Sequence, residues 1–272
     1  MLTSKKVSES IRLGSILMFS GGFLDAYSYL VRGQVFATAE TGNIALMGIS
    51  LARGDLAVAG RYLIPVAAYA AGIFLTEWIR MRVGENGTVH WKEGILWLEL
   101  LVMVLAGFMP QKWNSLVNCL IGFSCAMQVE AFRKMHGMAF ATTMCTGNLR
   151  SGTELLAVGT LENNGEQRKY GLWYYWIDLV FVAGAAASAL LCQVLAERAV
   201  WVCAAALLSA ILFIRYHRRM AAALAGLFSG EKVKAGIPVI CFLFHQLRGA
   251  VGKGSVQAHL SLSSRFLVFA LL

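Results

Sequence analysis

The sequence FATAETGN at residues 36–43 returns, with one inserted residue, as FATTMCTGN at residues 140–148. An acid precedes each copy at the same distance from the Thr-Gly-Asn triplet, Asp25 in the first and Glu130 in the second. Self-similarity of this kind is typical of duplication, and it governs the interpretation of the whole fold. The chain is therefore predicted to be an internal duplication up to about residue 216.

The composition is that of an integral membrane protein. Of the 272 residues, 58% are hydrophobic and only 14% are charged, and the mean hydropathy is +0.62. Soluble domains are about half apolar and about a quarter charged. The lipid bilayer is thus the first expected partner.

The charge distribution, the cysteine spacing and the missing motifs argue against several other classes of protein. Most Lys and Arg stand just beyond apolar stretches, so the net charge of +9 indicates cytoplasmic loops and no nucleic acid. The 6 cysteines contain no Cys-x-x-Cys pair, so neither a disulfide framework nor a metal site is expected. The sequence motifs of metalloproteases, serine hydrolases and P-loop proteins are missing too. We predict no enzyme, no catalytic residues and no cofactor.

Six stretches approach the length of about 20 mostly apolar residues that a spanning helix needs. Two further segments, residues 41–52 and 146–158, are too short to cross. Three crossings in each repeat would invert the second copy relative to the first. We expect an all-α polytopic fold of about six transmembrane helices as two inverted three-helix repeats, about residues 11–110 and 113–216, each with a short half-helix starting at Thr-Gly-Asn. The six stretches are residues 13–31, 57–79, 94–110, 113–132, 171–195 and 198–216.

Positive charge favours six crossings with both termini cytoplasmic, because cytoplasmic loops carry the excess of Lys and Arg. A cleavable signal peptide fits less well, since Asp25 interrupts the first apolar run. Small-residue runs at 67–72 and 183–188 occupy corresponding spans and are expected to be helix-packing seams. An eight-crossing arrangement would instead put outside Arg80, Arg82, Lys92, Arg133 and Lys134.

The chain divides into a single transmembrane domain, residues 1–220, and an atypical tail, residues 221–272. The tail is basic, and its apolar pieces are too short to span a bilayer. Two alternatives stay open for it: an interfacial segment, or a disordered sequence without a fold of its own.

The two Thr-Gly-Asn triplets are the first candidate substrate-binding site. A Thr oxygen at a helix start can accept a backbone N–H, so Thr41 and Thr146 are suited to be N-caps. The positive ends of two such helices, meeting in mid-bilayer, would favour an anion or the negative end of a solute. The structural alternative is a turn that merely starts a tightly packed helix. The Gly and Asn of each triplet leave the backbone accessible there: Gly42, Asn43, Gly147 and Asn148.

Asp25 and Glu130 are the second candidate, because carboxylates inside spans are costly and usually face a cavity or a partner. They would couple transport to a proton or cation, or else pair with a neighbour such as Arg133 or Arg150. Gln128 could add a polar contact or bond between helices. Arg150 either strengthens an anion site or is a counter-ion for Glu154 at i+4. Two further acids rank lower because they have no repeat partner: Glu99 and Asp178.

Residues 22–26, GFLDA, followed by residues 36–43 and then by the second Thr-Gly-Asn with Arg150, resemble the YoaK-like family, a domain of unknown function. The resemblance covers about residues 10–218. It implies a multi-pass protein of about six helices in the bacterial inner membrane, and no established substrate. The family usually has Asn or another polar residue where Glu130 stands.

Two functions follow as hypotheses. The first is a small-solute transporter or channel, working alone or as a homo-oligomer, for an unknown solute that could be an anion. The second is a non-transporting membrane scaffold or a stress or assembly protein, in which the polar turns are structural. The two hypotheses differ in whether the candidate residues line a shared hydrated cavity.

Overall fold

This computed structural model describes residues 9–38, 40–83 and 90–229 of the chain. The chain separates into two compact units, Met1–Ala221 and Ala222–Leu272. The duplicated sequence lies within the first unit. Nearly all of the tail that the sequence sets apart lies outside the described residues, so its two alternatives remain predictions.

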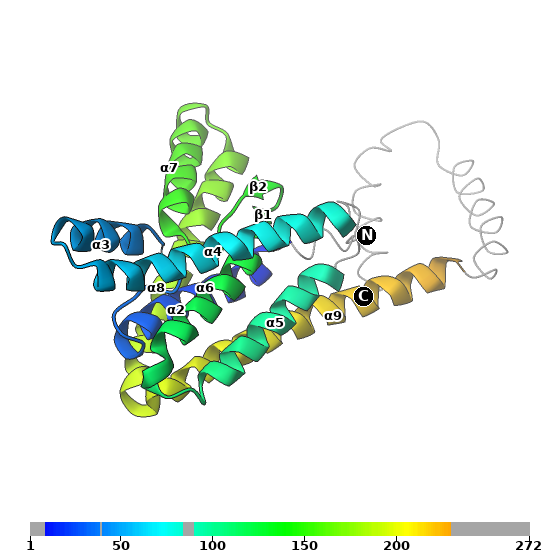
Figure 1. The fold of residues 1–272 in the computed structure, drawn as a ribbon. Helices are drawn as coiled ribbons and strands as arrows, with labels where there is room; N and C mark the ends of the chain where they lie inside the picture. The colour runs from blue at the N-terminus through cyan, green and yellow to red at the C-terminus, as the bar shows by residue number, and fades with distance from the viewer. Residues whose placement is uncertain (1–8, 39, 84–89, 230–272) are drawn as a thin grey trace, which may run out of the picture. The chain divides into compact units, whose positions relative to one another are not determined.

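The described chain is helical apart from one short β-ladder, which confirms the all-α prediction (Figure 1). By length and apolarity alone, two stretches could cross a membrane, Leu56–Val83 and Gly165–Met220. The expected six crossings therefore remain a prediction. The elements are α2 (Ile11–Val31), α3 (Glu40–Ala52), α4 (Leu56–Val83), α5 (His90–Ala106), η1 (Gln111–Trp113), α6 (Asn114–Ala131), β1 (Lys134–Met135), β2 (Met138–Ala139), α7 (Cys145–Leu161), α8 (Gly165–Leu195), η2 (Ala196–Val200) and α9 (Trp201–Ser229).

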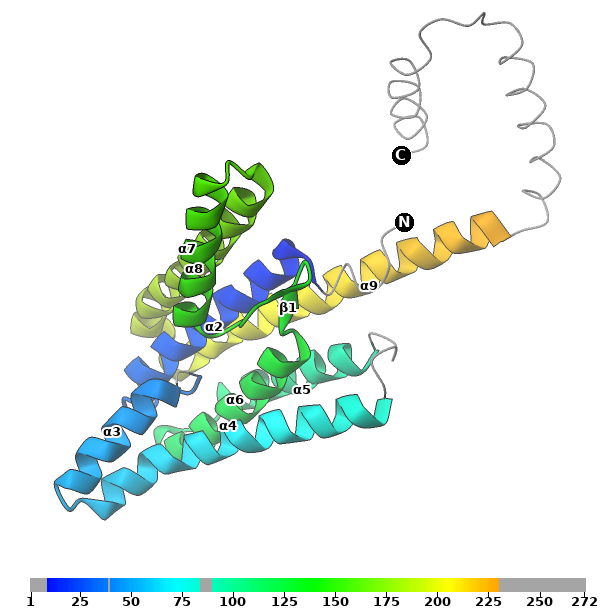
Figure 2. The same cartoon turned by 90° about the horizontal axis from the view of Figure 1, so that it is seen from above.

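The order of helices repeats along the chain. In α2 to α5, and again in α6 to α9, the second helix is shorter than the first and the third helix is the longest. The packing repeats as well, because α2 packs on α8 and α4 packs on α6, while α3 lies on α4 and α7 lies on α8 (Figures 1 and 2). Each half thus contributes the partner of the other half's first helix.

The first helices of the two halves, α2 and α6, run in opposite directions (Figure 2). At the end of α2, the backbone oxygen of Arg32 accepts a hydrogen bond from Asn118 Nδ2 near the start of α6, at 2.9 Å. At the other end, the backbone oxygen of Glu9, before α2, accepts from the backbone N–H of His136, after α6, at 2.9 Å. The two helices are therefore antiparallel.

Two close helix crossings occupy equivalent positions in the halves. A Cβ on Gly72 of α4 would lie 2.4 Å from the backbone oxygen of Phe123 of α6, and a Cβ on Gly184 of α8 would lie 2.2 Å from that of Phe19 of α2. Both distances are far shorter than a carbon and an oxygen can approach. Glycine is therefore required at each crossing, and the two small-residue runs are packing seams as expected.

The apolar core joins helices of both halves. Its fully buried side chains come from α2, α5, α6 and α9, for example Leu17, Leu96, Ile121 and Leu207. The sequence is apolar on nearly all faces of these helices, so residues that do not enter the core stay exposed. Exposed apolar side chains such as Phe74 and Leu179 are suited to lipid contact.

Candidate functional site

Asn43 and Asn148 hold the segment before each short helix in place. Asn43 Nδ2 donates to the backbone oxygen of Phe36 at 2.6 Å. Asn148 Nδ2 donates to the backbone oxygen of Ala141 at 2.9 Å, and its Oδ1 accepts from the N–H of Ala141 at 3.3 Å. Both asparagines are buried. Each therefore fastens the Phe-Ala-Thr segment to the first turn of the helix that follows it.

The predicted N-cap role of Thr41 and Thr146 is wrong. The helices begin one residue earlier, at Glu40 and Cys145, so each Thr is the second helical residue, and its side chain is exposed. In the second copy the cap position belongs to Met144, whose side chain makes no capping hydrogen bond. A sequence argument that expects a hydroxyl at the cap cannot anticipate this.

The two glycines of the triplets differ in their surroundings. A Cβ on Gly42 would lie 3.1 Å from the ring of Phe36, whereas a Cβ on Gly147 would meet nothing within 4 Å. Gly147 is exposed and Gly42 is half-buried. Thr41, Thr146 and Gly147 thus face outward, Gly42 packs against Phe36, and only the asparagines are buried.

Asp25 and Gln128 make equivalent contacts in the two halves. Asp25 Oδ1 accepts from the backbone N–H and the hydroxyl of Thr38, at 3.1 and 2.6 Å. Gln128 Nε2 donates to the hydroxyl of Thr142 at 3.2 Å. Thr38 and Thr142 are the third residues of the two Phe-Ala-Thr segments. By contact, the counterpart of Asp25 is therefore Gln128.

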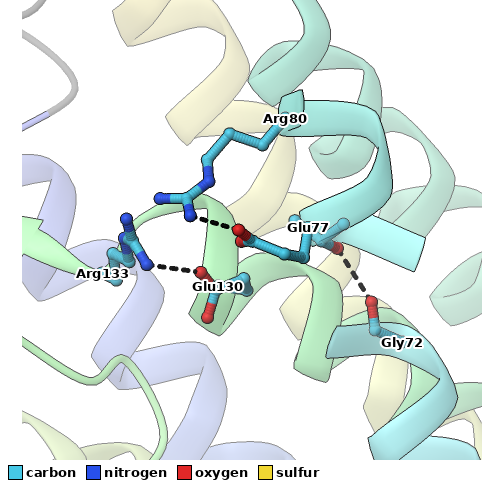
Figure 3. A network of polar contacts seen from close by, with 6 residues as sticks. Gly72, Glu77, Arg80, Glu130 and Arg133 are labelled. Carbon is cyan, nitrogen blue, oxygen red and sulfur yellow. Dashed lines mark hydrogen bonds and ion pairs between the residues drawn. The ribbon is translucent and has the colours of Figure 1, made fainter. Parts of the chain in front are cut away.

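Glu130, the expected counterpart, lies elsewhere. It is half-buried near the end of α6 and forms an ion pair with Arg133 at 2.9 Å, beside the pair of Arg80 and Glu77 on α4 (Figure 3). Residues 128 and 130 are two positions apart, which is about 200° around a helix. The same helix therefore turns Gln128 toward the Phe-Ala-Thr segment and Glu130 away from it.

Arg150 is exposed on α7. Within the part of the chain that the structure describes, no ion pair joins it to Glu154, so the expected i, i+4 counter-ion contact is not formed. Its exposure also separates it from the buried asparagine two residues earlier. The second copy therefore gains no buried positive charge from Arg150.

A group of buried and half-buried polar side chains surrounds the two Phe-Ala-Thr segments, and we call it the polar cluster. Asp25 is close enough to interact electrostatically with both Glu40 and Cys145, at the starts of α3 and α7. Asp25 therefore interacts with groups at the starts of both short helices. The cluster comprises Asp25, Glu40, Asn43, Tyr69, Gln128, Thr143, Cys145, Asn148 and Asp178.

Five members of the cluster lie outside the substrate site predicted from the sequence, and one of them, Asp178, is a lower-ranked candidate there. The five are Glu40, Tyr69, Thr143, Cys145 and Asp178. Tyr69 of α4 lies beside Thr143 and Glu40, and Asp178 of α8 lies beside Cys145 and Asn148. Glu40 directly precedes the first Thr-Gly-Asn, and Asp178 is an acid inside a span. Those two signals were available in the sequence, whereas Tyr69 in its alanine-rich seam gave none.

Several oxygens of the cluster are buried without a hydrogen-bond partner among the described residues. Four are acceptors of carboxylates or amides, and two belong to the hydroxyl groups of Tyr69 and Thr143, which lie next to each other. A buried polar atom left unpaired costs about 1–3 kcal/mol, so such atoms usually contact water or a ligand. The six atoms are Glu40 Oε1, Asn43 Oδ1, Tyr69 Oη, Gln128 Oε1, Thr143 Oγ1 and Asp178 Oδ1.

A separate charged group ties α5 to α9. Glu93, buried in the first turn of α5, forms ion pairs with Arg215 and with Arg218, the latter at 3.1 Å. Burial alone would raise the pKa of Glu93. Hydrogen bonds from Arg215 and Trp97, together with the charges of both arginines, outweigh burial and hold the pKa below its usual value. The ionised carboxylate is thus part of the packing between these helices.

The comparisons with known proteins identify a family and a transmembrane relative. The profile of the family described as protein of unknown function DUF1275 matches residues 13–214. The UPF0700 transmembrane protein YoaK of Bacillus subtilis (strain 168) is 24% identical to the chain over 147 residues, which cover 50% of this chain and 63% of that protein. The match thus spans less than two thirds of that relative. No solved structure matches the chain.

The resemblance to YoaK-like proteins is therefore confirmed. The transmembrane designation of the relative and the apolar helices together point to a membrane protein. Because the profile extends from the first residues of α2 into α9, it includes the polar cluster and both halves of the duplication. The chain belongs to the family of unknown function DUF1275.

Proposed function

We propose that the protein is a small-solute transporter or channel of the bacterial inner membrane, with its site at the polar cluster between two inverted repeats. The observation that carries the proposal is the set of four buried carboxylate and amide oxygens without hydrogen-bond partners among the described residues, drawn from both halves of the chain. A dry structural core would satisfy these atoms internally. A hydrated, solute-binding cavity explains why they are left unmatched.

The antiparallel course of α2 and α6 and the reciprocal packing of α2 with α8 and of α4 with α6 support the inverted repeat. Secondary transporters commonly place substrate sites at the interface of inverted repeats, near the starts of short helices. The multi-pass topology with both termini cytoplasmic belongs to the same proposal, because it follows from the distribution of Lys and Arg.

The chemistry of the cluster favours a solute that donates hydrogen bonds or carries positive charge. Four of the six unmatched atoms are carboxylate or amide acceptors, and three carboxylates, those of Asp25, Glu40 and Asp178, belong to the cluster. Arg150, which would have favoured an anion here, is exposed on α7. The site is therefore assigned to a small cation or a neutral solute rich in N–H or O–H groups.

The second candidate function is a non-transporting scaffold, and the two asparagines favour it. Asn43 and Asn148 each donate a hydrogen bond to the backbone of their own segment, as side chains in structural turns do. Under this alternative the cluster would be dry and would bind nothing. Solute binding therefore separates the two functions.

The test is a thermal-shift screen of the purified full-length protein in detergent against ammonium, guanidinium, polyamines, amino acids and small polyols. We expect at least one of these solutes to raise the unfolding temperature, and Asp178→Asn to abolish the shift. The matched control Glu162→Gln removes an exposed acid and should leave the shift intact. A screen without any stabilising solute, or an unchanged shift in Asp178→Asn, would favour the scaffold.

A further inference from the structure

A second polar site lies at the opposite end of α2 from Glu9, around Arg32. The Arg32 side chain is 0% exposed. Its Nε donates to Tyr27 Oη at 2.8 Å, its Nη1 to the backbone oxygen of Met109 at 2.8 Å, and its Nη2 to that of Ala106 at 2.6 Å. Nη1 also donates to Asn114 Oδ1 at 3.3 Å. These partners are all uncharged.

An arginine stays charged under all ordinary conditions. Among the ion pairs of the described residues none involves Arg32, and Glu197 acts on it only at longer range. The carbonyl groups at the end of α5 offer partial negative charge. A full positive charge therefore lies buried among dipoles, with the carboxylate of Glu197 acting on it but forming no ion pair with it. An anion in direct contact would offset the cost of this burial.

A cavity of about 50 Å³ adjoins this arginine. Arg61 of α4, an exposed residue, is part of its lining, and its Nη2 donates to the backbone oxygen of Gly33 at 3.3 Å. Asn114 Nδ2 and Arg61 Nη2 both approach Gly33, at 3.7 and 3.6 Å from the place where a Cβ would be. Gly33 has φ +92°, so glycine is suited to this turn.

The cavity is larger than one water needs, since about 10–15 Å³ of this measure suffices for a single water. It therefore has room for a small ion. Besides Asn118, three nitrogen-bearing side chains line it: Arg32 directly after α2, Arg61 of α4 and Asn114 of α6. Their donors would meet the oxygens of an anion.

Asn118 adds a hydrogen-bond acceptor to these donors. It lines the same cavity, is 2% exposed, and its Nδ2 donates to the backbone oxygen of Arg32 at 2.9 Å. That bond fixes the orientation of the amide, so Oδ1 points away from Arg32's carbonyl, and Oδ1 has no hydrogen-bond partner among the described residues. An occupant that donates one hydrogen bond as well as carrying negative charge would satisfy this oxygen.

We propose that this cavity binds a small oxyanion that bears one hydroxyl group, of which hydrogencarbonate is the smallest common example. Its charged oxygens accept from the two arginines and Asn114, and its hydroxyl donates to Asn118 Oδ1. The site is separate from the polar cluster, and its chemistry is the reverse, because the cluster is rich in acceptors. The proposal does not depend on solute transport at the cluster.

The experiment compares hydrogencarbonate with nitrate on the purified full-length protein, at mildly alkaline pH and constant ionic strength. Nitrate has the same charge, the same planar shape and a similar size, but it has no hydroxyl group. We expect hydrogencarbonate to bind by calorimetry and to raise the unfolding temperature. Nitrate should bind about tenfold more weakly, because one hydrogen bond to Asn118 is lost.

Two variants test whether hydrogencarbonate binds at this cavity. Arg61→Gln removes an exposed charge at the cavity and should weaken hydrogencarbonate binding by about tenfold or more. Arg53→Gln, which removes an exposed arginine of the loop before α4, is the control and should bind like the unaltered protein. Circular dichroism checks that both variants are folded.

Three results would overturn the proposal. They are the absence of hydrogencarbonate binding, equal affinity for nitrate, and an unchanged affinity in Arg61→Gln. None of them would alter the outcome of the solute screen at the polar cluster, so the two proposals fail separately.

Discussion

Single residues in the two halves do similar work with different chemistry. Asp25 accepts a hydrogen bond from the hydroxyl of Thr38, whereas Gln128 donates one to the hydroxyl of Thr142. A hydroxyl both donates and accepts, so either an acid or an amide can secure the segment. The duplication has therefore kept the contact and exchanged the group that makes it.

The asparagine contacts give the first prediction. Asn148→Ala removes a buried amide that both donates to and accepts from Ala141, so we expect a loss of about 1–3 kcal/mol in the free energy of unfolding. Thr146→Ala, two residues away and exposed, should change it by less than about 0.5 kcal/mol. Denaturant unfolding in micelles measures both. Equal stabilities for the two variants would contradict the clamping role of Asn148.

Glu93 gives a prediction on pH. Its folded-state pKa is lowered, so its contribution to stability is complete above the ordinary carboxylate pKa and is lost as pH falls through the folded value. At neutral pH, Glu93→Gln should lower stability by about 1–2 kcal/mol, because the buried partner of Arg215 and Arg218 loses its charge.

The measurement is the unfolding temperature of both proteins between neutral pH and about pH 3. The difference between them should shrink as the solution is acidified. Glu162→Gln, at an exposed acid, should follow the unaltered protein throughout. A difference that is independent of pH would show that the ion pairs contribute nothing.

At the scale of elements, the glycine crossings fix how the helices pack. Gly72 and Gly60 lie on the same helix, α4, but a Cβ at Gly72 would meet the backbone of α6 whereas one at Gly60 would meet nothing within 4 Å. We therefore expect Gly72→Ala to destabilise by about 1–3 kcal/mol through overpacking. Gly60→Ala should be neutral or stabilising by up to about 1 kcal/mol, since alanine is the better helix former.

The stabilities of Gly72→Ala and Gly60→Ala are compared by thermal unfolding. Size-exclusion chromatography checks that each variant gives a single monodisperse peak. Since the two variants share a helix and a substitution, intrinsic helix preference cancels from their comparison. If Gly72→Ala were as stable as Gly60→Ala, the close approach of α4 to α6 would not hold in the protein.

The sequence predicted the elements better than their details. The doubled motif gave two equivalent short helices, and the alanine-rich runs at 67–72 and 183–188 gave the crossings. The helix starts and the partner of Asp25 were missed, because both depend on a shift of one or two residues. A shift of that size leaves apolar periodicity unchanged but turns a side chain to another face.

At the scale of the whole molecule, the two halves are interlocked, since each supplies the helix against which the other's first helix packs. The duplicated motif predicted two related units, but the exchange of partners between them could not be predicted, because it depends on contacts far apart in sequence. The exchange brings Tyr69 and Asp178, which no repeat comparison singled out, to the starts of α3 and α7. The site is thus a property of both halves together.

Water access to the polar cluster is the most direct test of its role, and the chain carries its own probes. Cys145 is half-buried in the cluster, and Cys203 is fully buried in the apolar core. Two variants that each retain one of these cysteines can be treated, in membranes, with a small hydrophilic methanethiosulfonate reagent. Our account predicts that Cys145 reacts and that Cys203 does not. If Cys145 were as unreactive as Cys203 in the folded protein, the cluster would be dry and the proposed solute site would be contradicted.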